Sequence, residues 1–143
     1  MINVNDILKE KGNQFYAVSP SANVIDALRL MAEKNIGAVL VMDNDRLVGI
    51  FSERDYARKV VLAGKSSLNT PVSEIMSAGV ITVTKETSLH DCMQIMTEKH
   101  FRHLPVLEDD KVVGVVSIGD IVSRIIREQS NTIQQLENYI IRG

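Results

Sequence analysis

The chain contains one sequence unit written twice, and this repeat constrains the fold more than any other feature. Residues 18–60 align with residues 83–125 at a constant offset of 65 positions without a gap, and eleven of the 43 aligned pairs are identical. Upstream, residues 4–8 resemble residues 72–76, with three extra residues in the first copy. A chain of 143 residues suits one compact domain, so we expect the two copies to form it together.

Each copy carries the same succession of local patterns. A short apolar strand precedes a helix that begins at a Ser, Thr or Asn cap and buries one apolar stripe. Two β-branched runs joined by a polar turn then indicate an antiparallel hairpin, and a second helix follows. The expected strands cover residues 15–18, 38–42 and 47–51 in the first copy and residues 80–83, 104–107 and 112–116 in the second. We therefore expect an α+β (α/β) fold in which two β-α-β-β-α repeats pack with pseudo-two-fold symmetry.

These patterns divide the chain into four parts. The first repeat with its N-terminal helix covers residues 1–64, a linker 65–71, the second repeat 72–127, and a C-terminal helical extension 128–143. The extension keeps Ile133, Leu136 and Ile140 at helical spacing, which is typical of a helix that meets another helix. We expect this extension to help form a homodimer; the alternative is a helix that folds back on its own domain.

Composition and charge argue against several classes of protein. The net charge is −2 at pH 7, which indicates no strongly basic face, so we expect no nucleic-acid partner. The longest apolar runs have five residues, far fewer than the roughly 20 of a membrane helix, so we expect no membrane partner. The first residues do not resemble a signal peptide, and one cysteine cannot form an internal disulfide. These features predict a cytoplasmic protein.

Both copies contain the same short string where the hairpin meets the second helix. A glycine stands three residues before a serine and an aspartate three residues after it, as Gly49, Ser52 and Asp55 and again as Gly114, Ser117 and Asp120. The serine hydroxyl and the amides of a helix N-terminus suit a phosphate oxygen, and the two carboxylate oxygens suit two ribose hydroxyls. The alternative is a capping box, which needs only Ser and Asp. Capping does not explain the glycine, so we favour a nucleotide half-site in each copy.

These motifs, with the string Arg102-His103-Leu104-Pro105-Val106 in the second hairpin, resemble those of tandem CBS domains, the regulatory modules named after cystathionine β-synthase. The resemblance covers essentially the whole chain and is to the stand-alone type of CBS pair. It implies clefts for adenosine-containing ligands (AMP, ADP, ATP, and also NAD(H) or S-adenosylmethionine) and no required cofactor. It also implies a homodimer of the pair that acts on a regulated protein, which the sequence does not name.

The resemblance further implies that each cleft is built across the two repeats. One cleft has Ser52, Arg54 and Asp55 opposite Ile81, Thr82, Arg102, His103 and Pro105, and the other has Ser117 and Asp120 opposite Tyr16, Val18, Gly37 and Ala38. The first repeat has no Arg-His pair and no Pro at the matching positions, and residue 119 is Gly where residue 54 is Arg. Because arginine binds phosphate through charged hydrogen bonds, we expect phosphorylated ligands to prefer the cleft over Ser52. We expect the cleft over Ser117 to carry little charge.

The other cysteine and histidine residues that could carry chemistry indicate neither a catalytic residue nor a metal site. Cys92 stands on a buried helix stripe, where the first copy has Ala27, and His100 and His103 have no partners at metal-site spacing. The sequence therefore predicts a non-enzymatic regulatory module that senses an adenosine-containing ligand. Two alternatives stay open: a purely structural dimerisation module with vestigial clefts, and a nucleotide-acting enzyme, which would need a base or metal near the phosphates.

Overall fold

Two β-hairpins, one from each repeat, form the centre of the computed structural model, which describes residues 2–142. The first repeat supplies β1 (Ala17–Val18), β2 (Ala38–Asp43) and β3 (Arg46–Ser52), and the second supplies β4 (His103–Glu108) and β5 (Lys111–Ser117). The helices are α1 (Val4–Lys11), α2 (Val24–Lys34), α3 (Glu53–Asp55), the π-helical η1 (Tyr56–Val61), α4 (Val72–Ile75), α5 (Leu89–Lys99) and α6 (Ile118–Arg142). The predicted α+β fold with two repeats is confirmed.

The first strand is regular in only one repeat, where β1 covers Ala17–Val18 of the predicted residues 15–18. β1 runs parallel to β2, and the Leu40 N–H donates to the Tyr16 carbonyl at 3.0 Å. The position matching Leu40 is Pro105, which has no N–H to donate. The predicted strand over residues 80–83 is therefore wrong except for one bridge, in which Val83 pairs with Val106.

The caps and buried faces of α2 and α5 follow from local sequence. Asn23 and Asp26 form a capping box on α2, and the Ser88 hydroxyl accepts the Asp91 N–H at the start of α5. Each helix buries the expected stripe, which is Val24, Ala27 and Met31 in α2 and Leu89, Cys92 and Met96 in α5. Met93, which follows Cys92 in α5, lies outside this stripe and is 37% exposed. Burial, with the nearby Asp91 carboxylate, raises the pKa of the Cys92 thiol to about 11, as for a core residue.

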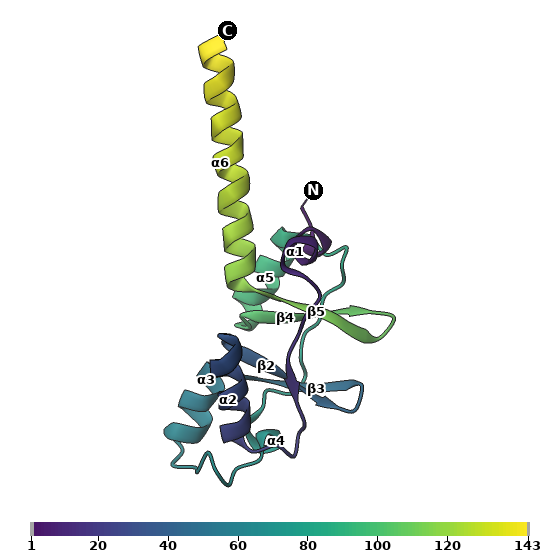
Figure 1. Ribbon diagram of the computed structural model, residues 1–143, viewed down its shortest axis with the longest axis vertical. Helices are drawn as coiled ribbons and strands as arrows, with labels where there is room; N and C mark the ends of the chain where they lie inside the picture. The colour runs from purple at the N-terminus through teal and green to yellow at the C-terminus, as the bar shows by residue number, and fades with distance from the viewer. Residues whose placement is uncertain (1, 143) are drawn as a thin grey trace.

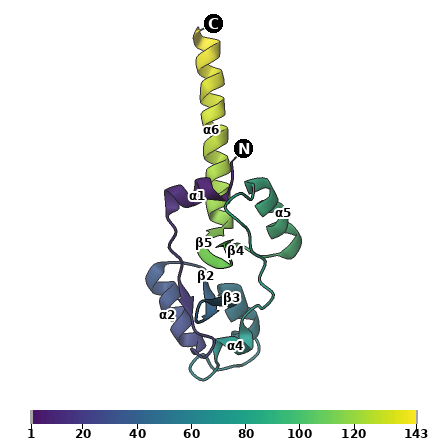
Figure 2. The same cartoon turned by 90° about the vertical axis from the view of Figure 1, so that its right-hand side faces the viewer.

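The two N-terminal helices are exchanged between the repeats. α1, from the start of the first repeat, places Val4, Ile7 and Leu8 in the hydrophobic core of the second repeat. α4, from the start of the second, places Val72 and Ile75 in the core of the first. Figures 1 and 2 show α1 at the end of the molecule that holds α5, β4 and β5, whereas α4 lies at the opposite end with α2 and β3. Each structural half thus contains pieces of both sequence copies, and the predicted boundaries between parts stay a prediction.

The last helix leaves the body of the molecule. Its first turns pack through Ile121 and Ile125, and Glu10 of α1 pairs with Arg124 and Arg127. Beyond Glu128 every side chain up to Ile141 is exposed, and α6 projects away from both sheets (Figures 1 and 2). The alternative that it folds back on its own domain is therefore wrong. Within residues 2–142 no helix combines the length and apolarity that crossing a membrane requires.

Candidate functional site

Both Ser-x-x-Asp motifs form capping boxes. The Ser52 hydroxyl accepts the Asp55 N–H at 3.2 Å, and Asp55 Oδ2 accepts the Ser52 N–H at 3.0 Å. In the second repeat the Ser117 hydroxyl accepts the Asp120 N–H at 3.1 Å, and Asp120 Oδ2 accepts the Ser117 N–H at 2.8 Å. The capping interpretation therefore holds for both copies, so any role in ligand binding must be additional to it.

The glycines of the motif have a packing role that the sequence interpretation missed. A Cβ on Gly49 would lie 2.5 Å from the Met76 sulfur, and one on Gly114 would lie 2.9 Å from Leu8 Cδ2. Leu8 lies within α1 and Met76 directly follows α4, so both residues belong to the exchanged segments. Glycine is thus needed at both positions to admit the helix from the other repeat. The glycine thus has a structural explanation and does not by itself favour a nucleotide half-site, which stays a prediction.

A wide cleft of about 930 Å³ lies over Ser52. Of the residues predicted for it, Ser52, Arg54, Asp55, Arg102 and His103 line it, whereas Ile81, Thr82 and Pro105 do not. Pro105 is instead buried in β4, and Val83, the bridging residue after Ile81 and Thr82, pairs beside it. Sequence reasoning did not assign Lys59, Ser77, Lys99 and His100, which also line the wide cleft. The basic residues outnumber the acidic ones there, so the cleft suits an anionic ligand.

The Asp55 carboxylate in the wide cleft is fully used by the protein. Its Oδ2 accepts from the backbone N–H and the hydroxyl of Ser52, at 3.0 and 3.1 Å. Its Oδ1 accepts from the Ser77 hydroxyl at 3.1 Å and pairs with Lys59 Nζ at 3.2 Å. The residue is 8% exposed. A ribose hydroxyl would have to displace one of these donors to reach this carboxylate.

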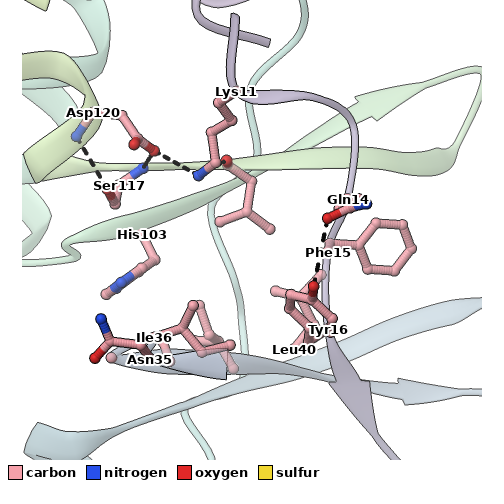
Figure 3. A pocket seen from close by; sticks show the side chains of 14 residues that line it. Lys11, Gln14, Phe15, Tyr16, Asn35, Ile36, Leu40, His103, Ser117 and Asp120 are labelled. Carbon is pink, nitrogen blue, oxygen red and sulfur yellow. Dashed lines mark hydrogen bonds and ion pairs between the residues drawn. The ribbon is translucent and has the colours of Figure 1, made fainter. Parts of the chain in front are cut away.

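A narrower cleft of about 360 Å³ lies over Ser117 (Figure 3). Tyr16, Gly37, Ala38, Ser117 and Asp120 line it as predicted, whereas Val18 does not. Sequence reasoning assigned His103, which also lines this cleft, only to the wide cleft, and it did not assign Phe15, Ile36, Leu40 and Ile50. These four are apolar, so one part of the cleft suits a flat apolar group, and the Ser117 and Asp120 side supplies polar atoms.

Lys11 brings a positive charge into the narrow cleft. Its Nζ lies 2.7 Å from Asp120 Oδ2 and donates to the Val115 carbonyl at 3.0 Å. Burial alone would raise the pKa of Asp120, but the hydrogen bonds from Lys11 and Ser117 outweigh it and lower that pKa. Asp120 Oδ1 accepts no hydrogen bond from any residue between 2 and 142. The expectation that this cleft carries little charge is therefore wrong. Sequence reasoning missed Lys11 because it precedes the aligned repeat and has no counterpart in the alignment.

The two clefts share a wall. Gly37, Ile50, His103 and Ser117 line both of them. The ring of His103 lies near Gly37, where a Cβ would be 3.7 Å from His103 Cε1. Figure 3 shows the same ring between the Ser117 side and the segment of Asn35 and Ile36. Burial, followed by the Lys11 charge, lowers the pKa of His103 and so favours the neutral form of the ring.

A paired-repeat fold with two clefts at the inter-repeat junction agrees with what comparison with known proteins finds. Residues 4–62 and 72–127 each match the family model of the CBS domain. The chain is 38% identical over 149 aligned residues to the mitochondrial CBS domain-containing protein CBSX3 of Arabidopsis thaliana, covering 98% of this chain and 72% of that protein. The chain therefore belongs to the CBS-domain family, and CBS-pair proteins are regulatory modules.

Two solved structures of CBS-domain proteins are similar to the structure of this chain. A CBS-domain protein from Burkholderia ambifaria is 50% identical with a TM-score of 0.86, over 89% of this chain and 96% of that one. CBSX2, whose structure holds AMP, is 27% identical with a TM-score of 0.72, over 90% of this chain and 99% of that one. A relative of the same fold thus binds an adenine nucleotide.

Proposed function

We propose that this protein is a non-enzymatic regulatory module that binds an adenosine-containing ligand between its two repeats. The observation that carries the proposal is the narrow cleft, where an apolar wall faces a carboxylate with one unused oxygen and an ammonium group. The expected ligands are AMP, ADP and ATP, and NAD(H) and S-adenosylmethionine share the same adenosine part. The AMP held by CBSX2 supports this choice of ligand class.

In the narrow cleft the proposed ligand meets three kinds of surface. The adenine lies against apolar side chains such as Ile36 and Leu40, which remove its faces from water. The ribose hydroxyls donate to Asp120 Oδ1, the oxygen without a partner among residues 2–142. A phosphate lies within reach of Lys11, whose ammonium has donors to share between phosphate and Asp120.

In the wide cleft the ligand is proposed to be held mainly by its phosphates. Arg54, Arg58 and Arg102 line this cleft together with Lys59 and Lys99. Asp55 is saturated, so the ribose contact proposed for Asp120 has no ready equivalent here. We therefore assign ligands with more phosphate groups, such as ADP and ATP, to the wide cleft.

The structural alternative, a dimerisation module with vestigial clefts, draws its support from the saturated Asp55. A thermal-shift and calorimetry panel with AMP, ADP, ATP, NAD(H) and S-adenosylmethionine separates the two functions. Binding of at least one ligand supports the sensor, and binding of none supports the structural module. Turnover of a bound nucleotide, followed by chromatography of the mixture, would instead support the enzyme.

The ribose assignment has its own matched pair of variants. Asp120→Asn keeps the side-chain shape and one capping acceptor but loses the charge, and we expect it to weaken AMP binding about tenfold or more, roughly 1.4 kcal/mol. Asp109→Asn makes the same change in the exposed turn between β4 and β5 and serves as the control. Equal affinities of the two variants would contradict the assignment.

We also propose that the protein is a homodimer, that it is located in the cytoplasm and that it acts on a regulated protein partner.

A further inference from the structure

The projecting part of α6 carries an apolar stripe that the body of the protein does not cover. The apolar side chains of this stripe are 40% to 75% exposed and lie three, four or, across Gln129, seven residues apart: Val122, Ile126, Ile133, Leu136 and Ile140. The stripe is separate from the neighbouring face of α6, where Ile121 and Ile125 pack into the core of the second repeat. An exposed stripe of this length on a free helix indicates an interaction surface.

The spacing of the stripe is that of a coiled coil. With Ile126 as position a of a heptad, Ile133 and Ile140 also occupy a, and Val122, Gln129 and Leu136 occupy d. The seam from 122 to 140 spans about 27 Å of helix. Ile at a with Leu at d favours two parallel strands over higher oligomers. The pattern therefore predicts one partner helix with a matching heptad.

The low charge of the projecting segment suits a second copy of this chain as the partner. Residues 129–141 include a single charged side chain, Glu137, so this segment attracts neither an anionic membrane nor a strongly charged protein. For the same reason two copies of the segment hardly repel each other. The one polar seam residue, Gln129, has an amide that both donates and accepts hydrogen bonds, so it satisfies its own counterpart. Parallel helices in register produce this match, whereas antiparallel helices whose crossing point lies away from Gln129 set it against a different residue.

We propose that the α6 helices of two copies form a parallel, in-register, two-stranded coiled coil with its seam at residues 122–140. The two bodies then lie at the same end of the coiled coil. Ser117 caps α6 and Asp120 stands in its first turn, so each narrow cleft lies at the base of the coiled coil. This arrangement is independent of whether the clefts bind a nucleotide.

Disulfide cross-linking of the full-length chain tests the orientation and register. The background variant is Cys92→Ala, because the first repeat has Ala27 at the same place. Gln129→Cys puts a thiol at a d position, where in-register parallel helices bring it against its own counterpart within disulfide reach. Asn131→Cys puts one at an f position on the opposite face. We expect air oxidation to convert most of the Gln129→Cys protein to a covalent dimer and little of the Asn131→Cys protein.

A second pair of variants tests the seam without cross-linking. Ile133→Asn is expected to raise the dimer dissociation constant at least about 100-fold, measured by light scattering over a concentration series. Ile141→Asn makes the same change at an exposed residue outside the seam, and we expect it to leave the constant within about threefold of the original. Absence of the Gln129→Cys cross-link, a monomeric unmodified chain, or equal effects of the two Asn variants would each overturn the proposal.

Discussion

The two motif aspartates occupy matching positions but use their carboxylates differently. Asp55 has four protein donors around its two oxygens, whereas Asp120 leaves Oδ1 unused and shares Oδ2 between Ser117 and Lys11. A carboxylate that already has its full set of donors contributes to the fold, and one with an unused oxygen also suits a ligand. The same motif therefore has a structural role in one cleft and a proposed binding role in the other.

Replacement of Asp55 distinguishes these roles. We expect Asp55→Ala to lower the free energy of unfolding by about 1–3 kcal/mol, because it removes a helix cap and leaves buried donors without an acceptor. The affinity of the narrow cleft for AMP should stay within about twofold. Urea denaturation and calorimetry on the same variant give both numbers. An unchanged stability together with a tenfold loss of AMP affinity would instead make Asp55 a ribose-binding residue.

The pKa of His103 predicts a pH dependence of stability. Burial, the Lys11 charge and the Arg102 charge lower this pKa below its unfolded value, against the opposing effect of Asp120. The unfolded chain then binds more protons than the folded chain as the pH falls below about 6.5, so stability is present above that pH and lost below it. We expect His103→Gln to lose less stability than the unmodified protein between pH 7 and pH 5. Parallel pH profiles of urea midpoints would contradict the assignment.

At the scale of whole elements, α1 determines the charge of the narrow cleft. Its last turn carries Lys11 toward Asp120, while its Glu10 pairs with Arg124 and Arg127 of α6. Lys11 and Asp120 are 109 positions apart, so their meeting depends entirely on where α1 packs. One short helix thus supplies both a core face and a cation that lines the narrow cleft.

Neutralising Lys11 should affect phosphate more than nucleoside. We expect Lys11→Met to weaken AMP binding about tenfold and adenosine binding by less than about threefold, because only AMP carries the phosphate. The salt dependence of AMP binding should fall as well. Lys9→Met, on the same helix and exposed, is the matched control. Equal losses for AMP and adenosine would mean that Lys11 acts only by holding the cleft together.

At the scale of the whole molecule, the exchanged helices join the two repeats into one unit. Leu8 fills the space above Gly114 and Met76 the space above Gly49, so each hairpin is packed by a residue from the other sequence copy. Neither half has a complete core without the N-terminal segment of the other. The two repeats are therefore expected to unfold together.

A double-mutant cycle tests this exchanged packing. Gly114→Ala should destabilise the protein by about 1–3 kcal/mol, because the new methyl group meets Leu8 Cδ2 at 2.9 Å. With Leu8→Ala already present, the same change should cost clearly less, since the obstructing side chain is gone. Gly119→Ala is the control, because its Cβ would meet only Ser117 Oγ at an ordinary 3.6 Å. Additive losses at Gly114 and Leu8 would contradict the packing.

The sequence by itself determined the elements whose causes lie within a few residues. The hairpins form where β-branched runs flank turns with left-handed Asn44, Asp109 and Asp110, and the caps form where Ser or Asn precedes Asp by three residues. These interactions join neighbours, so they are visible as spacing. The duplicated motif and the family resemblance together predicted paired clefts, with Ser52, Asp55, Ser117 and Asp120 at their walls, where the structure has them.

Only the tertiary structure decided which segments meet across the molecule. The exchange of α1 and α4, the packing role of Gly49 and Gly114, and the entry of Lys11 into the narrow cleft all depend on contacts between distant residues. Two packings of the same helices, exchanged or not, bury similar apolar faces, so hydrophobic periodicity does not distinguish them. The distinction comes from the shape of the partner surface, where a missing Cβ admits a Leu or Met side chain from the other repeat.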